Sequence, residues 1–242
     1  MCTLTYIPGK NGNYRIASNR DEGDARTPSL PPGIIEMAGQ KLLYPKDPDG
    51  GGTWLAISEQ GRLACLLNGA FGRHLHQPPY RMSRGLVVLQ QFMLPGPCHF
   101  YADYPLSGIE PFTLVIVEPK PKINITEIKW DGSQKHLRWV DPERPQIWSS
   151  EMLYDPADIQ HRHTLFSDWL KEKTGEPFPL RKFHLFGRDN PEIRGIFKNK
   201  SGPVATVSLT SVEIRDKVAA MKHENFLTNS ESEIRLPLMT EG

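Results

Sequence analysis

The sequence predicts an α+β fold in which mainly antiparallel sheets are covered by helices. Segments with two-residue alternation gather at the start and in the middle of the chain, helix signals separate and follow them, and one more strand comes last. Because sheets and helices must bury their apolar faces, this grouping favours two sheets with a helical layer on each side. The 242 residues can bury one large core, and we expect one domain over residues 1–242.

Charge and cysteine content exclude several classes of partner and site. The 29 basic and 28 acidic residues give a net charge of +1, so the chain lacks the basic surface typical of a nucleic-acid or anionic-membrane binder. Its three cysteines are far apart and lack metal-site spacing, so we expect a reducing compartment and no bound cofactor. No signal segment opens the chain and no apolar run approaches the ~18 residues of a membrane span, so we expect a cytoplasmic protein.

The first two predicted strands form a hairpin. Residues 2–7 and residues 14–19 are the strands, and turn-forming residues 8–13 lie between them. We expect Ile7 to face Tyr14, although a slip of a residue or two in this register is possible.

Cys2 is the candidate nucleophile. The alternation places it on the same side of its strand as Leu4, and the expected register places it opposite Asn19, with Arg20 and Asp21 just beyond. A free thiol titrates near about 8.5; the charge of Arg20 favours the thiolate, and Asp21 can orient a polar partner. Removal of the initiating methionine would free an α-amino group whose pKa of about 7.7 to 8.0 suits a general base.

A loop and a second hairpin follow. Residues 23–40 contain several prolines without periodicity and are predicted to be a loop. A short strand at residues 41–44 precedes a hairpin formed by residues 53–58 and 62–68. The glycines at residues 50–52 can bring the backbone close to a ligand, or they can simply form a tight turn.

Capping residues predict where two helices begin. Ser83 is the expected N-cap of a helix that Pro95 ends, and Asp155 followed by Pro156 predicts a longer helix that ends at Gly175. The shorter helices and the remaining strands are predicted at residues 98–104, 112–118, 123–130, 135–140, 146–150, 180–186 and 204–214.

The other cysteines and a histidine pair have simpler interpretations. Cys65 and Cys98 lack the neighbours of Cys2, and we expect both to be buried structural thiols. His74 and His76 are two residues apart with no nearby cysteine or carboxylate, which is typical of surface residues rather than of metal or haem ligands.

The motifs together resemble a known family. An N-terminal Met1-Cys2, a hairpin and the tetrapeptide Asn19-Arg20-Asp21-Glu22 resemble the NRDE family, also called the transport-and-Golgi-organisation-2 family. The resemblance continues in order at Asp47, Gly51-Gly52-Thr53-Trp54, Leu67-Asn68 and Ser83-Arg84-Gly85. It implies a four-layer αββα sandwich of the N-terminal-nucleophile hydrolase type, similar to choloylglycine hydrolases and penicillin V acylases.

The resemblance also implies roles for particular residues. Cys2, Arg20, Asp21 and Asn68 would be catalytic, with Asn68 donating a hydrogen bond to the oxyanion. The implied substrate-binding residues are Asn19, Gly51, Gly52, Thr53 and Trp54. The chain departs from the family at Trp148-Ser149-Ser150, where many members have Leu-Ser-Asn, so it lacks a second amide donor there.

Two functions follow from this resemblance. The first is a cysteine hydrolase that acts on a non-peptide amide or related acyl compound. The second is a binding or trafficking protein that uses the same cleft for a hydrophobic metabolite such as haem, acyl-coenzyme A or a lipid. In both cases the expected partner is a small molecule rather than a nucleic acid.

Overall fold

The computed structural model describes residues 3–23, 25–119, 122–172, 180–190, 192–199 and 203–239. The candidate nucleophile Cys2 and the helix end predicted at Gly175 lie outside these residues. None of the described helices is long and apolar enough to cross a membrane.

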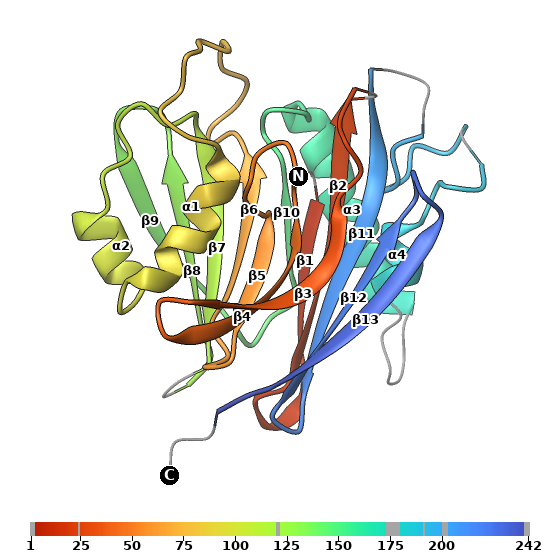
Figure 1. Ribbon diagram of the computed structural model, residues 1–242. Coiled ribbons are helices and arrows are strands. Elements are labelled where there is room, and N and C mark those ends of the chain that lie inside the picture. The colour runs from red at the N-terminus through yellow and green to blue at the C-terminus, as the bar shows by residue number, and fades with distance from the viewer. Residues whose placement is uncertain are drawn as a thin grey trace.

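Two antiparallel sheets lie face to face, with helices on their outer sides (Figure 1). The first sheet has the strand order β10-β1-β2-β11-β12-β13, and the second runs in sequence order from β3 to β9. The first sheet contains β1 (Thr3–Pro8), β2 (Tyr14–Gly23), β10 (Gln146–Ser149), β11 (Val204–Arg215), β12 (Val218–Asn225) and β13 (Ser230–Pro237). The second contains β3 (Leu30–Met37), β4 (Gln40–Lys46), β5 (Leu55–Ser58), β6 (Leu63–Asn68), β7 (Phe112–Glu118), β8 (Asn124–Trp130) and β9 (Lys135–Val140). The helices are α1 (Arg84–Gln90), α2 (Pro97–Asp103), α3 (Pro156–Glu172) and α4 (Leu180–His184), with 3₁₀ turns η1 (Lys10–Gly12) and η2 (Gln91–Met93).

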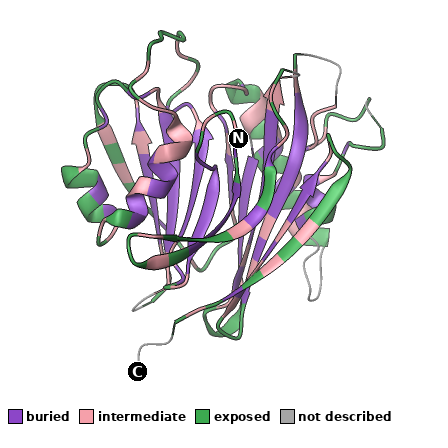
Figure 2. Ribbon diagram, in the orientation of Figure 1, coloured by how far each residue is buried: buried purple, intermediate pink, exposed green. Residues whose placement is uncertain are grey.

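Buried clusters join these layers. One fills the space between the sheets and includes Leu4 and Cys65. A second joins the β3–β9 sheet to α1 and α2 and includes Phe100, and a third joins the other sheet to α3 and α4 through Phe166 and Phe183. The strands between the helical layers are accordingly mostly buried (Figure 2). The predicted α+β fold and its four-layer αββα arrangement are confirmed.

Strand alternation decides which layer each side chain of β1 enters. Leu4 and Tyr6 pack between the sheets, whereas Thr3, Thr5 and Ile7 face α3 and α4. Successive side chains of a strand point to opposite faces, so a single strand contributes to both interfaces.

The first hairpin forms as predicted, but its register differs by one residue. Thr3 faces Asn19, and Tyr14 faces Pro8 instead of Ile7. The strand β1 continues through Pro8, one residue further than expected, which shortens the loop and moves the pairing.

The loop predicted for residues 23–40 is wrong, because β2 extends into this range and β3 occupies its second half. Pro31 and Pro32 have no amide hydrogen, but β3 lies at the edge of its sheet, where a strand can lack donors on its free side. Ala38 and Gly39 both have positive φ (52° and 74°) and form a tight two-residue turn into β4.

Two further expectations are wrong. The strand β11 is not the last, because β12 and β13 follow it; Asp216 and Lys217, with φ of 51° and 63°, make the first of these reversals. Cys98 is exposed on α2 rather than buried, whereas Cys65 is buried as predicted.

The predicted helix starts are confirmed. The Ser83 hydroxyl accepts a hydrogen bond from the backbone N–H of Gly85 at 3.3 Å, at the beginning of α1. The Asp155 carboxylate accepts one from the backbone N–H of Asp158 at 2.8 Å, at the beginning of α3.

Candidate functional site

The tetrapeptide at residues 19–22 is divided between two environments. Arg20 points toward the second sheet, where its Nη2 lies 3.4 Å from Asp47 Oδ1. Asn19 points the other way, toward α4, and its side-chain amide donates to the backbone carbonyl of His184 at 3.1 Å. Successive side chains of β2 point to opposite faces of the sheet. The side chains of Arg20 and Glu22 therefore face a pocket, whereas those of Asn19 and Asp21 face the helical layer.

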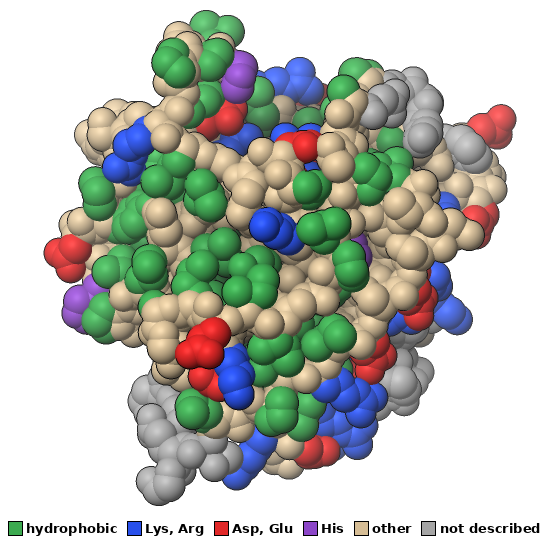
Figure 3. All heavy atoms as spheres, viewed as in Figure 1, with side chains coloured by type: hydrophobic (Ala, Val, Ile, Leu, Met, Phe, Trp, Pro, Cys, Tyr) green, Lys and Arg blue, Asp and Glu red, His purple; other side chains and the backbone are tan. Residues whose placement is uncertain are grey.

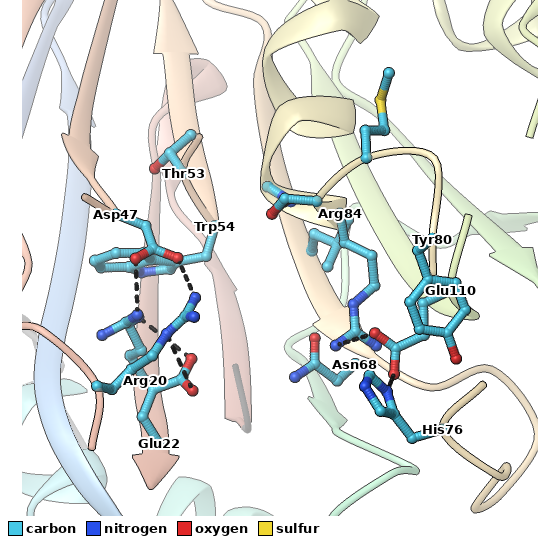
Figure 4. Close-up of a pocket in the computed structure, with 15 residues that line it drawn as sticks. Arg20, Glu22, Asp47, Thr53, Trp54, Asn68, His76, Tyr80, Arg84 and Glu110 are labelled. Atoms are coloured by element: carbon cyan, nitrogen blue, oxygen red, sulfur yellow. Dashed lines mark hydrogen bonds and ion pairs between the residues drawn. The ribbon is translucent and has the colours of Figure 1, made fainter. Parts of the chain in front are cut away.

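The pocket is a cavity of about 450 Å³ between the ends of the two sheets and the N-terminus of α1 (Figure 4). Charged side chains of both signs gather near the loop that rises at the top of the molecule (Figure 3). The residues that line the pocket are Arg20, Glu22, Arg26, Asp47, Thr53, Trp54, Leu66, Asn68, His76, Tyr80, Met82, Ser83, Arg84, Gly85 and Glu110.

The first wall of the pocket is an ion-pair network around Arg20. This guanidinium is only 2% exposed and lies 4.9 Å from the centre of the Trp54 ring. Glu22 Oε1 lies 3.5 Å from its Nε, and Asp47 also pairs with Arg26 at 2.5 Å.

Several buried polar atoms of this wall have no hydrogen-bond partner among the described residues. They include Nη1 and Nη2 of Arg20, Oδ1 of Asp47 and Nε1 of Trp54. Buried donors and acceptors in native proteins are nearly always paired with protein or water. Apart from the 3.4 Å ion-pair contact between Arg20 Nη2 and Asp47 Oδ1, these atoms make no polar contact within the described residues, so water or a ligand can satisfy them.

The second wall stands opposite and was not recognised from the sequence. Arg84 Nη2 pairs with Glu110 Oε2 at 3.0 Å, and Arg84 Nη1 donates to the backbone carbonyl of Pro111 at 3.1 Å. The other Glu110 oxygen contacts His74 Nε2 at 3.1 Å and His76 Nδ1 at 3.2 Å. Burial lowers the pKa of the Arg84 guanidinium, and the carboxylate of Glu110 opposes this shift.

Asn68 lies between the two walls, at the end of β6 (Figure 4). Its backbone carbonyl accepts hydrogen bonds from the Ser150 hydroxyl at 2.8 Å and from the Met152 backbone N–H at 3.3 Å. Within the described part of the chain, its side-chain amide has no hydrogen-bond partner. The carbonyl contacts hold the strand end in place while leaving the amide free to meet a ligand oxygen; its catalytic role remains a prediction.

Asp21 and Asn19 lie outside the lining of the pocket. Asp21 accepts hydrogen bonds from the Tyr154 hydroxyl at 2.8 Å and from the Thr206 hydroxyl at 2.7 Å. Asn19 is buried against His184. In the structure these two residues connect β2 to the elements behind it, and their predicted roles in catalysis and substrate binding remain predictions.

The glycines before β5 allow their turn to pack closely against the backbone at the start of α1. Gly51 has φ of 70° and faces open space, as a turn residue does. At Gly52, an added Cβ would lie 2.2 Å from the carbonyl carbon of Gly85. The neighbouring Thr53 backbone N–H donates to the Gly85 carbonyl at 3.2 Å. Close packing of this turn on the start of α1 thus fixes one edge of the pocket, whereas substrate contacts at residues 51–54 remain predicted.

Two buried histidines contact residues next to the pocket. His223 lies 5.9 Å from the Trp54 ring, between hydroxyl oxygens of Ser29 at 3.1 Å and Thr210 at 2.8 Å. Burial, and then the charge of Arg20, lower its pKa to about 4. It is therefore neutral at pH 7.

His184 occupies the helical side of β2. Its ring nitrogens contact Thr5 Oγ1 at 2.8 Å and Asn19 Oδ1 at 2.9 Å. Burial, and then the charge of Arg162, lower its pKa to about 3. Neither buried histidine stands out in the sequence, because each lies in a short segment whose partners are distant along the chain.

Neither of the described cysteines has the setting of a nucleophile. Burial raises the pKa of the Cys65 thiol to about 12, so this thiol stays protonated. Cys98 is exposed and does not line the pocket. No group of three or more His, Cys, Asp or Glu side chains within the described ranges could hold a metal ion.

Solved structures similar to this chain are hydrolases and acylases. A mutant of the conjugated bile acid hydrolase from Clostridium perfringens has a TM-score of 0.59 at 10% identity, covering 97% of this chain and 92% of that one. Penicillin V acylase from Agrobacterium tumefaciens has a TM-score of 0.55 at 11% identity, over 96% and 86% of the two chains. The Caenorhabditis elegans N-acylethanolamine-hydrolyzing acid amidase ortholog has a TM-score of 0.51 at 12% identity, over 87% and 92%.

At these identities the likeness shows the fold alone, which is that of the N-terminal-nucleophile hydrolases. A search of curated proteins found no significant match. The family model described as "Transport and Golgi organisation 2" matches residues 1–177. Because this match spans most of the sequence, the chain belongs to the transport and Golgi organisation 2 family.

Proposed function

We propose that the chain is a cysteine hydrolase that cleaves an amide bond in a non-peptide acyl compound, with Cys2 as the nucleophile. The observation that carries this proposal is the polar pocket beside the end of the β1–β2 hairpin, with buried donors of Arg20 on one wall and the free amide of Asn68 between the walls. The similar solved structures are named as a conjugated bile acid hydrolase, a penicillin V acylase and an N-acylethanolamine-hydrolyzing acid amidase ortholog, which is consistent with this chemistry.

Strand alternation supports Cys2 as the attacking group. The sequence places Cys2 on the same side of its strand as Leu4, and Leu4 packs on the face of the first sheet toward which Arg20 points. Thr3, the next residue in the sequence, faces Asn19. On this basis the thiol would belong to the face that carries the pocket, and the Arg20 charge would favour its thiolate.

The proposed reaction has two steps. The Cys2 sulfur attacks the amide carbonyl carbon while the free α-amino group of Cys2 takes the thiol proton, and that proton passes to the leaving amine as the C–N bond breaks. Water then attacks the thioester carbonyl and releases the carboxylic acid and the thiol. Asn68 donates a hydrogen bond to the oxyanion in both steps, a contact worth about 2.7 to 4 kcal/mol in transition-state stabilisation.

The pocket favours a polar substrate portion over a hydrophobic metabolite. Its lining contains Arg20, Arg26 and Arg84 together with carboxylates, and only a few large apolar side chains. Burying an apolar ligand there would desolvate these charges without giving them partners. A wholly apolar ligand therefore has less support from the geometry. The alternative function, carriage of haem, acyl-coenzyme A or a lipid, would require the propionates, phosphates or head group of the ligand to pair with these arginines.

The test is an intact-mass measurement before and after brief exposure to a thiol-selective electrophile at pH 7, followed by assays on a panel of N-acyl compounds. We expect loss of Met1, a first adduct on Cys2, and turnover that disappears in Cys2→Ser. Cys98→Ser is the matched control and should retain full activity. A retained Met1 with an unreactive Cys2 would contradict the hydrolase proposal, and ligand binding that survives in Cys2→Ser without any turnover in the natural sequence would support the carrier instead.

A further inference from the structure

A buried arginine lies behind β1, on the side away from the pocket. Arg162 of α3 is 5% exposed, and its Nη1 donates to Thr3 Oγ1 at 2.6 Å. Its Nη2 donates to the backbone carbonyl of Ile196 at 3.3 Å, and its guanidinium carbon lies 3.8 Å from the centre of the Tyr154 ring. The guanidinium is thus held against the residue that follows Cys2 in the sequence.

Arg162 differs from Arg20 and Arg84, which line the pocket, in its contacts with carboxylates. Arg20 and Arg84 each have a carboxylate oxygen within 4.0 Å. Among the described residues, none lies so close to Arg162. Asp158, one turn earlier on α3, pairs with Arg194, and that hydrogen bond, together with the charge of Arg162, lowers the pKa of the Asp158 carboxyl group. Tyr154 connects Arg162 to Asp21, because its ring lies against the guanidinium and its hydroxyl donates to that carboxylate.

A buried charge without a close ion pair is costly for folding. The effective penalty for burying an ion is several kcal/mol, and only excellent pairing offsets it. The hydroxyl, carbonyl and aromatic contacts of Arg162 reduce this cost but do not neutralise the charge. An apolar side chain of similar length would avoid the cost of burying the charge, but it would leave Thr3 Oγ1 and the Ile196 carbonyl without this donor. The hydrogen bonds account for a donor at this position, whereas packing does not require that the donor carry a charge.

We infer that Arg162 is a positioning residue for Cys2. It fixes Thr3 from behind and supplies a permanent positive charge on the helical side of β1, opposite to the side on which Arg20 lies. A cation near a thiol favours the thiolate, so a guanidinium on each side of the strand would raise the reactivity of Cys2. Tyr154 joins the same network to Asp21, because its hydroxyl donates to that carboxylate. The inference rests on the proposed function and adds a component from α3, far from the N-terminus in sequence.

The three cysteines allow a test within a single chain. The rate of alkylation of Cys2 by iodoacetamide at pH 7, divided by that of the exposed Cys98, measures Cys2 reactivity with Cys98 as the internal reference. We expect Arg162→Met to lower this ratio about tenfold, which corresponds to about one unit in the thiol pKa. Arg162→Lys keeps the charge and should restore most of the ratio, which a purely structural role does not predict.

Arg181→Met is the matched control, because Arg181 also belongs to the helical layer but pairs with Glu224 at 2.7 Å. It should leave the ratio unchanged. Thr3→Val removes the hydroxyl that Arg162 binds while keeping the side-chain shape, and it should lower the ratio even if Arg162→Met fails to fold.

The outcomes separate the inference from the proposed function. If Cys2 is unreactive in the natural sequence, the hydrolase proposal and this inference both fail. If Cys2 is reactive there but equally reactive in a folded Arg162→Met and in Thr3→Val, only the role of Arg162 is overturned.

Discussion

Gly52→Ala is expected to lower the free energy of unfolding by about 3 kcal/mol or more, whereas Gly51→Ala should lower it by about 1 to 2 kcal/mol. The added Cβ at Gly52 would lie 2.2 Å from the Gly85 carbonyl carbon and 2.5 Å from the Leu86 nitrogen, so backbone must move. At Gly51 only the positive φ of 70° is unfavourable, since nothing lies within 4 Å of the added atom. Urea unfolding of the two variants measures this difference.

The Gly52 substitution should also disturb the pocket. The segment that must shift includes Ser83, Arg84 and Gly85, which line the second wall. We therefore expect Gly52→Ala to weaken ligand binding, and Gly51→Ala to leave it nearly unchanged. Equal stability losses in the two variants would show that the turn and α1 are not packed as closely as the structure indicates.

Acidification from pH 7 to pH 5 is expected to lower the free energy of unfolding by about 4 kcal/mol through His184 and His223 alone. Folding lowers the pKa of both rings, to about 3 and about 4, so in this range the folded protein keeps them neutral. The unfolded chain takes up protons below its ordinary histidine pKa of about 6.5, and at pH 5 this favours unfolding by about 2 kcal/mol per ring. The stabilisation is thus fully present above pH 6.5 and is lost as the pH falls toward the folded-state values.

Urea unfolding at pH 7, 6 and 5 tests this expectation. His184→Gln and His223→Gln should each be less stable at pH 7, because they lose buried hydrogen bonds, but each should remove about half of the pH dependence. The exposed His99 provides the control, since His99→Gln should leave the pH dependence intact. A double variant of the buried pair with an unchanged pH dependence would refute the assignment.

The sequence predicts much of the fold because the signals are local. Alternation identifies the β1–β2 hairpin, and the hydroxyl and carboxylate caps at Ser83 and Asp155 mark two helix starts. The strand β3 escapes prediction because Pro31 and Pro32 normally interrupt strands, and only its edge position accommodates them.

The site is less predictable because its second wall depends on contacts between distant segments. Glu110 lies in a loop before β7 and meets His74, His76 and Arg84 only in the folded chain. The division of residues 19–22 follows from the two-residue period, but the period alone does not say which face meets the pocket. That assignment requires α4, whose His184 holds Asn19, to be placed behind the sheet.

The edge position of β3 has a consequence for solubility. Leu30, Ile34 and Ile35 are exposed on this strand, and an exposed apolar edge invites a strand of another molecule to pair with it. Pro31 and Pro32 offer no amide hydrogen to such a partner, so an intermolecular ladder would be interrupted near its start. Pro31 and Pro32, which make the sequence of β3 look like a loop, thus protect the folded protein against edge-to-edge aggregation.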